Sequence, residues 1–448
     1  MIDRAGIWCV VLAFLMAGSM AQSGEVRAPN VVILLADDLG YGDLGCYGHP
    51  TIRTPHLDQM AAEGMKLTQY YGAPLCTPSR AALLTGRLPI RSGLNRVLFP
   101  TSTGGIPDDE VTLAEALKAH GYATMCIGKW HLGHLPRYLP RRHGFDHYFG
   151  IPYSNDMDVK KSGHPPIPLM RDETIIEQPA VQETLTLRYT REALRWIRRH
   201  GGETGRSQPF FLYLAYTFPH VPLHAGKAFR GKSPRGLYGD VVEEIDWSVG
   251  QILAAVRDQG LAESTLVVFT SDNGPWLVTA SQGGSAGLLR EGKGSTWEGG
   301  VRVPCLAWWP GTIARGRVAL DLVSELDLFA TCLELAGAKG PDDRPIDGVS
   351  FSAVLRGTGP SPRTHLYHYL DGELTAVRNG PWKLHLKTVN PAFGQDRAQA
   401  RNPPLLFHLM IDPSERANQA DQHPEVIDQI LKDIDAHRRS LKPGHPQL

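Results

Sequence analysis

The chain has 448 residues, of which 42% are hydrophobic and 21% are charged, a composition typical of a globular protein larger than one ordinary domain. Lysine and arginine together number 46, and so do aspartate and glutamate, so the formal net charge is zero. Nothing in this balance indicates binding to nucleic acids or anionic membranes. Recognition of an anion must therefore depend on a few cations gathered in one site.

The first 21 residues have the pattern of an export signal. Arg4 precedes an apolar run at 7–17, and the small residues Ser19 and Ala21 follow. The run is shorter than the roughly 20 apolar residues that a membrane span requires. We expect cleavage after Ala21, a periplasmic or secreted protein, and no stable membrane insertion; the alternative is an uncleaved anchor.

Continuous apolar runs of strand length alternate with helical patterns in the first three quarters of the chain. Such runs are typical of strands that are buried on both faces of a parallel sheet. The predicted strands are 31–35, 122–127, 210–215 and 265–270. The predicted helices between them are 57–64, 113–120, 185–200 and 241–259. This alternation predicts an α/β sandwich with a mainly parallel central sheet flanked by helices. Two segments, 162–179 and 280–300, are predicted to be long loops.

The pattern changes after about Gly337. Short strand-like segments follow, and then an amphipathic helix runs from Pro424 to about Ser440. The strand-like segments are 366–369, 375–378, 382–386 and 405–409. They predict a smaller C-terminal subdomain with an antiparallel sheet and a packed helix. We therefore divide the chain into a signal peptide at 1–21, a main domain at 28–337 and a C-terminal subdomain at 338–448.

Polar side chains follow two of the predicted strands, where each strand ends. Asp37 and Asp38 come directly after the first strand, and Asp272 and Asn273 follow the strand at 265–270. In open α/β sheets ligands bind beyond the carboxyl ends of the strands, so these side chains are expected to meet. Carboxylate and amide oxygens suit Ca²⁺ or Mg²⁺ and do not suit zinc or copper. Each pair taken alone is equally suited to capping a turn or a helix.

The segment that begins at Cys76 has the pattern of a helix start. Thr77 can be the N-cap, Pro78 suits the first helical position, and Gly86 can end the helix. Cys76 then stands at the positive end of a short helix, where anions are stabilised, and Arg80 can point to the same place. From these residues alone, a buried structural thiol and a thiolate nucleophile of lowered pKa both remain open.

One segment resembles the signature of the type I sulfatase family, within the alkaline phosphatase superfamily: Cys76-Thr77-Pro78-Ser79-Arg80, with Leu84-Thr85-Gly86-Arg87 after it. In that family a maturation enzyme oxidises the cysteine to Cα-formylglycine (3-oxoalanine), and the hydrate of this aldehyde is the nucleophile. Other segments resemble family motifs in the family's order: 37–40, 128–133, 272–274 and 289–300. The last of these is similar to the arylsulfatase A branch, and 307–311 is similar to the N-acetylgalactosamine-6-sulfatase branch.

By this resemblance, residues 28–337 are the catalytic domain. The resemblance implies a metal ion, Ca²⁺ as the first choice and Mg²⁺ as the second, with these ligands: Asp37, Asp38, Asp272, Asn273 and the oxygen of the modified Cys76. It also implies that Lys129 and Lys293 bind the sulfate and that Arg80 steadies the formylglycine hydrate. Ser154 aligns with a substrate-contacting serine of the arylsulfatase A group, although a serine before Asn-Asp also suits a plain turn.

The resemblance implies that two histidines transfer protons. Lys129 and His131 are two residues apart, so in an extended segment they face the same way. His131 resembles the histidine that takes a proton from the formylglycine hydroxyl when the sulfated enzyme collapses. His220, which follows the predicted strand at 210–215, resembles the general acid that protonates the departing alcohol, and we prefer it to the nearby His224.

The implied reaction is the hydrolysis of a sulfate ester, by the resemblance that of a carbohydrate. One hydroxyl of the hydrated aldehyde attacks sulfur, and the second hydroxyl then allows the aldehyde to re-form and sulfate to leave. The expected protein partner is the formylglycine-generating maturation enzyme, and no nucleic-acid partner is expected. Two alternatives are a phosphate or phosphonate ester hydrolase of the same superfamily and a non-catalytic glycan binder in which Cys76 stays unmodified.

Overall fold

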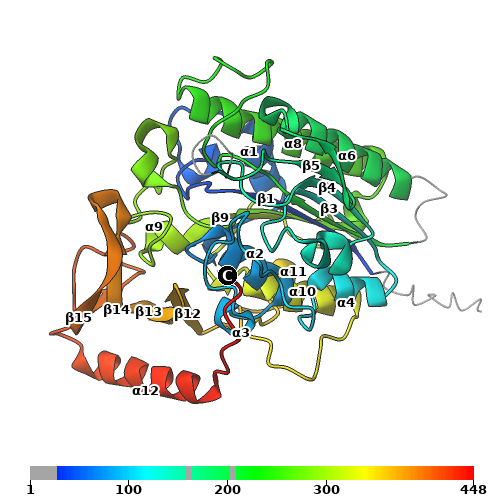
Figure 1. The fold of residues 1–448 in the computed structure, drawn as a ribbon. Helices are drawn as coiled ribbons and strands as arrows, with labels where there is room; N and C mark the ends of the chain where they lie inside the picture. Colours follow the sequence, from blue (N-terminus) through cyan, green and yellow to red (C-terminus); the bar gives the residue numbers. More distant parts are fainter. Residues whose placement is uncertain (1–27, 158–162, 202–207) are drawn as a thin grey trace, which may run out of the picture.

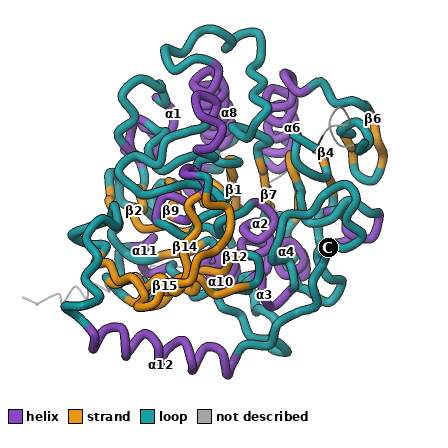
Figure 2. The backbone as a smooth tube through the Cα atoms, turned by 60° about the vertical axis from the view of Figure 1, so that its left-hand side comes forward, coloured by secondary structure: helices purple, strands orange, loops and turns teal. Residues whose placement is uncertain are grey.

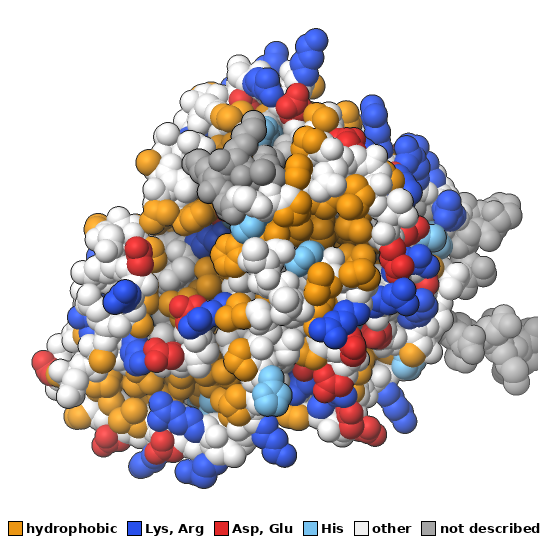
Figure 3. All heavy atoms as spheres, viewed as in Figure 1, with side chains coloured by type: hydrophobic (Ala, Val, Ile, Leu, Met, Phe, Trp, Pro, Cys, Tyr) orange, Lys and Arg blue, Asp and Glu red, His pale blue; other side chains and the backbone are white. Residues whose placement is uncertain are grey.

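The computed structural model describes residues 28–157, 163–201 and 208–448. The predicted export signal at 1–21 lies outside these residues. Two layers of helices enclose a large sheet, and a smaller sheet packs beside them (Figure 1). Positive and negative side chains are interspersed over most of the face in Figure 3, and positive ones are more frequent at its upper right. In the described part of the chain, no helix is long and apolar enough to cross a lipid bilayer.

The large sheet has eleven strands in the described residues, and its central part is parallel. The strand order is β10-β2-β9-β8-β1-β7-β3-β4-β5-β6, with β11 paired to β2. The strands are β1 (Asn30–Ala36), β2 (Met65–Tyr71), β3 (Ala123–Lys129), β4 (His147–Ile151), β5 (Leu169–Arg171), β6 (Thr174–Glu177), β7 (Phe210–Ala215), β8 (Thr265–Ser271), β9 (Arg302–Trp308), β10 (Arg317–Ala319) and β11 (Val323–Ser324). Central β1 runs parallel to both of its neighbours, β7 and β8.

Strand β1 shows why this sheet has a hydrophobic core on each face. Val31, Ile33 and Leu35 pack in one hydrophobic cluster, and the residues that alternate with them pack in the other. Successive side chains of a strand point to opposite faces, so a strand that is covered on both sides needs apolar residues at every position. The continuous apolar run at 31–35 has this physical cause.

Helices cover both faces of the sheet (Figure 1). One face packs against α1 (Pro55–Glu63), α6 (Leu185–His200) and α8 (Leu237–Asp258). The other face packs against α2 (Cys76–Thr85), α4 (Leu113–Ala119) and α10 (Leu326–Ala336). Three shorter helices are α3 (Pro89–Ser92), α9 (Glu298–Val301) and α11 (Ser352–Arg356).

The C-terminal part forms a separate four-stranded antiparallel sheet. Its strands, in spatial order, are β12 (His365–Leu370), β13 (Glu373–Asn379), β14 (Trp382–Asn390) and β15 (Gln395–His408). Helix α12 (Pro424–Ser440) runs alongside this sheet (Figure 2), and its Ile430 and Ile434 pack against Val377 and Leu384. The predicted fold class, a mainly parallel sandwich with a smaller antiparallel sheet and helix, is confirmed.

One predicted loop is wrong in part. Strands β5 and β6 form a hairpin at the edge of the large sheet, inside the segment 162–179 that the sequence predicts to be a loop. Three of the four β6 residues are exposed. An edge strand with so little burial carries a weak hydrophobic pattern, so its sequence does not distinguish it from a loop.

Candidate active site

Three parallel strands bring polar residues to the same edge of the large sheet. β1 leads into Asp37 and Asp38, the adjacent β8 leads into Asp272 and Asn273, and β3 ends at Lys129. These five side chains belong to residues that are at most 2% exposed. The backbone N–H of Asp38 donates to Oδ1 of Asp272 at 3.1 Å, which joins the two strand ends directly. The two acidic pairs therefore lie next to each other, as predicted.

Helix α2 places Cys76 against these strand ends. The Sγ of Cys76 lies 3.6 Å from Oδ1 of Asp37. The predicted end of the helix at Gly86 is confirmed, with a φ of 65° that favours glycine. The predicted N-cap, Thr77, is wrong, because the helix already starts at Cys76. The Thr77 hydroxyl instead donates to the backbone carbonyl of His131 at 3.0 Å.

Two buried cations surround Asp37. Lys129 Nζ donates to Asp37 Oδ2 at 2.5 Å, and Arg80 Nη2 lies 3.5 Å from the same oxygen. Arg80 also donates to Oδ2 of Asp272 at 2.8 Å, so it bridges two strand ends. Burial alone raises the pKa of Asp37, but the positive charges around it, that of Lys129 foremost, hold this pKa well below its ordinary value. Asp37 is therefore ionised at neutral pH.

Asp38 is the meeting point of Lys293, Asn273 and His220. Lys293 Nζ lies 2.8 Å from Oδ1 of Asp38, and Asn273 Nδ2 donates to the same oxygen at 2.7 Å. His220 Nε2 lies 3.6 Å from Oδ2 of Asp38. Burial alone lowers the pKa of Lys293, but the Asp38 carboxylate raises it above its ordinary value. The backbone of Asp38 has a φ of 66°, a strained conformation for a non-glycine residue and one that clusters at functional sites.

The oxygen donors at this edge fit a divalent cation. Four residues offer ligand atoms that lie within 4.8 Å of one another: Asp37, Asp38, Cys76 and His220. Asn273 Oδ1 is buried beside them and has no hydrogen-bond partner among the described residues. Burial and the charge of Asp37 raise the pKa of Asp272 to about 7, so a further positive charge is needed to keep every carboxylate here ionised. Carboxylate and amide oxygens in this combination suit Ca²⁺ or Mg²⁺.

The unmodified Cys76 thiol is not an activated nucleophile. Burial raises its pKa to about 12, although Lys129 and Lys293 act in the opposite direction. A thiol of this pKa stays protonated at neutral pH, and the thiolate is the reactive form. The structure therefore argues against the thiolate of lowered pKa that the sequence left open. None of the described cysteines is in a disulfide.

His131 lies just beyond the end of β3. Its Nε2 is 2.9 Å from the backbone carbonyl oxygen of Leu98, and its Nδ1 is buried without a hydrogen-bond partner among the described residues. Burial and the charges of Lys129 and Arg80 lower the pKa of His131 well below its ordinary value, so the ring is neutral. The extended geometry predicted for this segment is wrong, because the strand ends at Lys129 and His131 has a φ of 60°.

His220 faces Asp38 from the loop that follows β7. Its Nδ1 is 2.5 Å from the carbonyl oxygen of Val221, which leaves Nε2 directed at the site. Burial and the charge of Lys293 lower the pKa of His220. His224 is half-buried and its ring contacts Phe218 instead. Of the two histidines, the structure therefore brings His220 to the acidic pairs.

Three residues near the site belong to no motif quoted from the sequence. The ring of Trp276 lies 5.4 Å from the ring of His220 and 4.6 Å from Lys293 Nζ. Glu325 accepts a hydrogen bond from Ser79 on α2, and burial raises the pKa of its carboxyl group well above the ordinary value. The third is Leu98, which contributes only a backbone carbonyl. Trp276 follows Asn273 by three positions, and only this closeness to a predicted ligand in the sequence could have indicated that it lies near the site.

Ser154 also reaches the site. It is 1% exposed, and its Oγ accepts a hydrogen bond from Lys129 Nζ at 3.1 Å. The hydroxyl therefore orients the same ammonium group that pairs with Asp37. The contact places Ser154 inside the site and not in an exposed turn.

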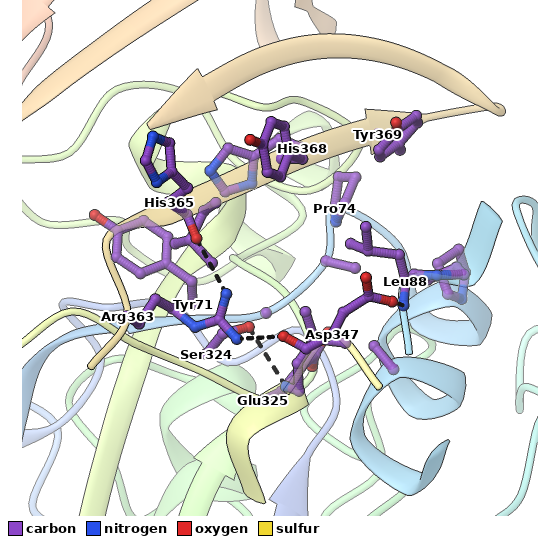
Figure 4. Close-up of a pocket in the computed structure, with 18 of the residues that line it drawn as sticks. Tyr71, Pro74, Leu88, Ser324, Glu325, Asp347, Arg363, His365, His368 and Tyr369 are labelled. Atoms are coloured by element: carbon purple, nitrogen blue, oxygen red, sulfur yellow. Dashed lines mark hydrogen bonds between the residues drawn. The ribbon is translucent and has the colours of Figure 1, made fainter. Parts of the chain in front are cut away.

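A separate cavity of about 310 Å³ lies on the other side of α2, between that helix and β12 (Figure 4). Figure 4 shows Tyr71, Glu325 and Arg363 in its wall. The charge of Arg363 is neutralised by Asp327 within the protein. None of the residues implied as metal ligands, sulfate-binding residues or proton-transfer groups lines this cavity, so it is distinct from the site around Cys76.

Known proteins resemble this chain over almost its whole length. The family model described as Sulfatase matches residues 29–338, and the model for the C-terminal region of aryl-sulfatase matches 361–448. The chain is 41% identical to N-acetylgalactosamine-6-sulfatase from Canis lupus familiaris, over 98% of this chain and 91% of that protein. It is 46% identical to arylsulfatase A from Bos taurus, over 96% of this chain and 89% of that protein.

A solved structure gives the same result. The PsFucS1 sulfatase from Pseudoalteromonas sp. is 32% identical and superposes with a TM-score of 0.85, over 92% of this chain and 90% of that chain. The sequence resemblance, the fold and the geometry at the strand ends all point in one direction. This chain belongs to the sulfatase family and is a sulfuric ester hydrolase.

Proposed function

We propose that this sulfatase hydrolyses sulfate esters of carbohydrates with a Cα-formylglycine made from Cys76 and a bound divalent cation. The observation that carries the proposal is the position of Cys76, which is 1% exposed at the start of α2 with its Sγ 3.6 Å from Asp37. The buried cations Lys129, Lys293 and Arg80 surround the same point. A formylglycine here supplies a hydrated aldehyde, whose hydroxyl is the nucleophile.

Ca²⁺ is our first choice of cation and Mg²⁺ is the second. The proposed ligands are Asp37, Asp38, Asp272, Asn273 and the oxygen of the modified Cys76. The buried Oδ1 of Asn273, which has no hydrogen-bond partner within the described residues, supports this set, because such an atom lacks an interaction that a cation provides. A bound cation supplies positive charge that polarises the sulfate ester and stabilises an ionised nucleophile.

Lys129 and Lys293 are the proposed sulfate-binding residues. A sulfate ester carries one negative charge, and its transition state distributes charge over several oxygens, so fixed cations lower the barrier. Lys129 is held by Ser154 Oγ at 3.1 Å, and Lys293 lies over the Trp276 ring at 4.6 Å. Both ammonium groups are therefore oriented before the substrate arrives. Ser154 is proposed to contact the substrate from the same side.

Arg80 is proposed to steady the nucleophile. Its Nη1 donates to the backbone carbonyl of Lys129 at 2.6 Å, and its Nη2 donates to Asp272. The guanidinium is thus fixed one helical turn from Cys76. A fixed cation here favours the ionised form of a hydroxyl at position 76.

The two histidines have different proposed roles. His220 directs Nε2 at the site and, in its protonated form, gives its proton to the oxygen of the departing alcohol. His131 is neutral and keeps Nδ1 free of hydrogen bonds within the described residues, so it can accept a proton from the second hydroxyl. This transfer is what allows the sulfated enzyme to release sulfate.

Two observations support a carbohydrate as the substrate. A similar protein bears the name N-acetylgalactosamine-6-sulfatase. The ring of Trp276 is partly exposed next to His220, where the departing alcohol would lie. Aromatic side chains are typical of the walls of small-molecule sites.

We also propose the organisation and location of the chain. Residues 28–337 form the catalytic domain, which contains every proposed site residue, and 338–448 form the C-terminal subdomain. The pattern of residues 1–21 supports export to the periplasm or out of the cell. The proposed partner is a formylglycine-generating maturation enzyme.

The test is a substrate comparison with enzyme that has been co-expressed with a maturation enzyme. We expect hydrolysis of at least one member of a panel of sulfated mono- and oligosaccharides, and faster hydrolysis of 4-nitrophenyl sulfate than of 4-nitrophenyl phosphate. Faster cleavage of the phosphate would favour the phosphatase alternative. Cleavage of aryl sulfates with no activity on any sulfated sugar would contradict the carbohydrate assignment.

A further inference from the structure

A second cavity, of about 380 Å³, lies between helix α6 and the β3–β4–β5 side of the large sheet. We call it the α6 cavity; Figures 1 and 2 show α6 beside β4. None of the proposed site residues lines it. Met125 in its wall and Lys129 in the active site are four residues apart on β3, about 13 Å along a parallel strand. A single sugar unit is shorter than this separation, so a ligand that occupies both sites must be an oligosaccharide.

The cavity lies against a positively charged helix in a chain whose formal net charge is zero. Helix α6 has five arginines and one glutamate, which give it a formal net charge of +4. Arg195 and Arg199 of this helix, with Arg171 of β5, line the cavity. Lysine and arginine side chains gather at the upper right of Figure 3, where Figure 1 has α6. Positive charge is therefore concentrated here locally.

The two acidic residues in the wall are engaged within the protein. Glu192 accepts hydrogen bonds from Arg195, at 2.6 Å, and from Arg171. Asp172 Oδ1 accepts the backbone N–H of Tyr148 at 3.0 Å. Each guanidinium has five N–H donors, so Arg171 and Arg195 keep donors beyond those that Glu192 uses. The acids fix the arginines in place and do not exhaust them.

Two further groups in the wall have no hydrogen-bond or ion-pair partner among the described residues. Arg199 makes no hydrogen bond or ion pair with the described residues. Trp196 is 6% exposed, and its Nε1 has no hydrogen-bond partner in the part of the chain that the structure describes. An indole Nε1–H and a guanidinium can only donate. The cavity therefore offers unused donors and positive charge, which match a ligand rich in acceptor oxygens and negatively charged.

We propose that the α6 cavity is a second, non-catalytic site that binds a sulfate or carboxylate group of an anionic oligosaccharide. Another sulfate ester of the same molecule then occupies the active site. The inference rests on the proposed function, because only a substrate with several anionic groups can use both sites. Such a site raises the affinity for oligomers over monomers without changing the chemical step.

Arg199→Glu and Arg198→Glu are a matched pair for the test. Both residues are exposed neighbours on α6, and both changes alter the net charge equally, but only Arg199 lines the cavity. The matured full-length enzyme is titrated calorimetrically with dextran sulfate oligosaccharides and with uncharged dextran of the same length. We expect Arg199→Glu to weaken dextran sulfate binding about tenfold or more, as loss of a charge-assisted contact does, and Arg198→Glu to weaken it much less.

The kinetic arm uses a sulfated oligosaccharide and a sulfated monosaccharide. We expect Arg199→Glu to raise KM for the oligosaccharide and to leave kcat and the monosaccharide kinetics unchanged. Equal weakening by both variants would show a diffuse charge effect and overturn the proposal, as would no weakening by either. If neither sugar is hydrolysed, the proposed function fails, while the titration still tests the α6 cavity.

Discussion

Replacement of Lys293 by methionine tests the proposed electrostatic role of this residue. Methionine keeps an unbranched side chain but lacks the ammonium group that lies 2.8 Å from Asp38. Loss of one fixed donor to transition-state charge typically costs about 2.7–4 kcal/mol, so kcat/KM should fall by about 10²–10³-fold. The variant also breaks a buried ion pair, so the free energy of unfolding should fall by about 3 kcal/mol. Steady-state kinetics on a sulfated sugar and denaturant unfolding measure the two effects.

Lys383→Met provides the matched control. Lys383 Nζ lies 2.7 Å from Oε1 of Glu298, and both side chains are completely buried in a pair that contains none of the proposed site residues. This variant should lose similar stability and keep the kcat/KM of the folded enzyme. The reasoning would be refuted if Lys293→Met retained full kcat/KM, or if Lys383→Met lost as much kcat/KM as Lys293→Met.

The remaining predictions concern the nucleophile, the pH dependence and the cation. Cys76→Ser should become sulfated and stay so, because a plain alcohol lacks the second hydroxyl; mass spectrometry would detect the adduct, and continuous turnover would contradict it. The kcat/KM should fall with rising pH, and the fall should begin below the ordinary histidine pKa of about 6.5. His220 must carry its proton to act as the acid. Burial and the charge of Lys293 lower the pKa of His220, so this proton is lost at a pH below the ordinary histidine pKa. A pH profile of kcat/KM that rises toward alkaline pH would contradict this role. Chelation should abolish turnover and lower the Tm, and Ca²⁺ should restore both. Asn273→Ala should weaken Ca²⁺ binding by at least about tenfold in calorimetry, and unchanged binding would remove Asn273 from the ligand set.

The strand ends were predictable because two simple patterns coincide. A continuous apolar run such as 31–35 indicates a strand buried on both faces, and the first polar residue after it marks the carboxyl end. Asp37 and Asp272 both follow such runs, and β1 and β8 are parallel neighbours. Parallel pairing puts both ends at one edge, so the meeting of these residues follows from local sequence and sheet topology.

Other parts of the site depend on contacts that the sequence does not encode locally. Leu98 acts on His131 through a backbone carbonyl, which any residue type has. Glu325 is 246 positions from its partner Ser79, and a lone acid gives no pattern. The turn at His131 was missed because an extended segment was assumed to continue past β3. Long-range packing decides each of these features.

The α2 start illustrates a local error. Thr77 has a residue type favoured at N-caps, and it precedes a proline, so propensity predicts a cap there. In the structure the helix starts one residue earlier, and the Thr77 hydroxyl donates to the carbonyl of His131. A tertiary hydrogen bond therefore overrides the local preference.

The most direct test of the proposal is the dependence of turnover on the state of Cys76. Preparations matured to different extents are assayed on one sulfated sugar, and peptide mass spectrometry measures the fraction of Cys76 converted to formylglycine. We predict that kcat is proportional to this fraction and extrapolates to zero for the unmodified chain. Full turnover by a preparation in which every Cys76 remains a cysteine would contradict the proposed mechanism.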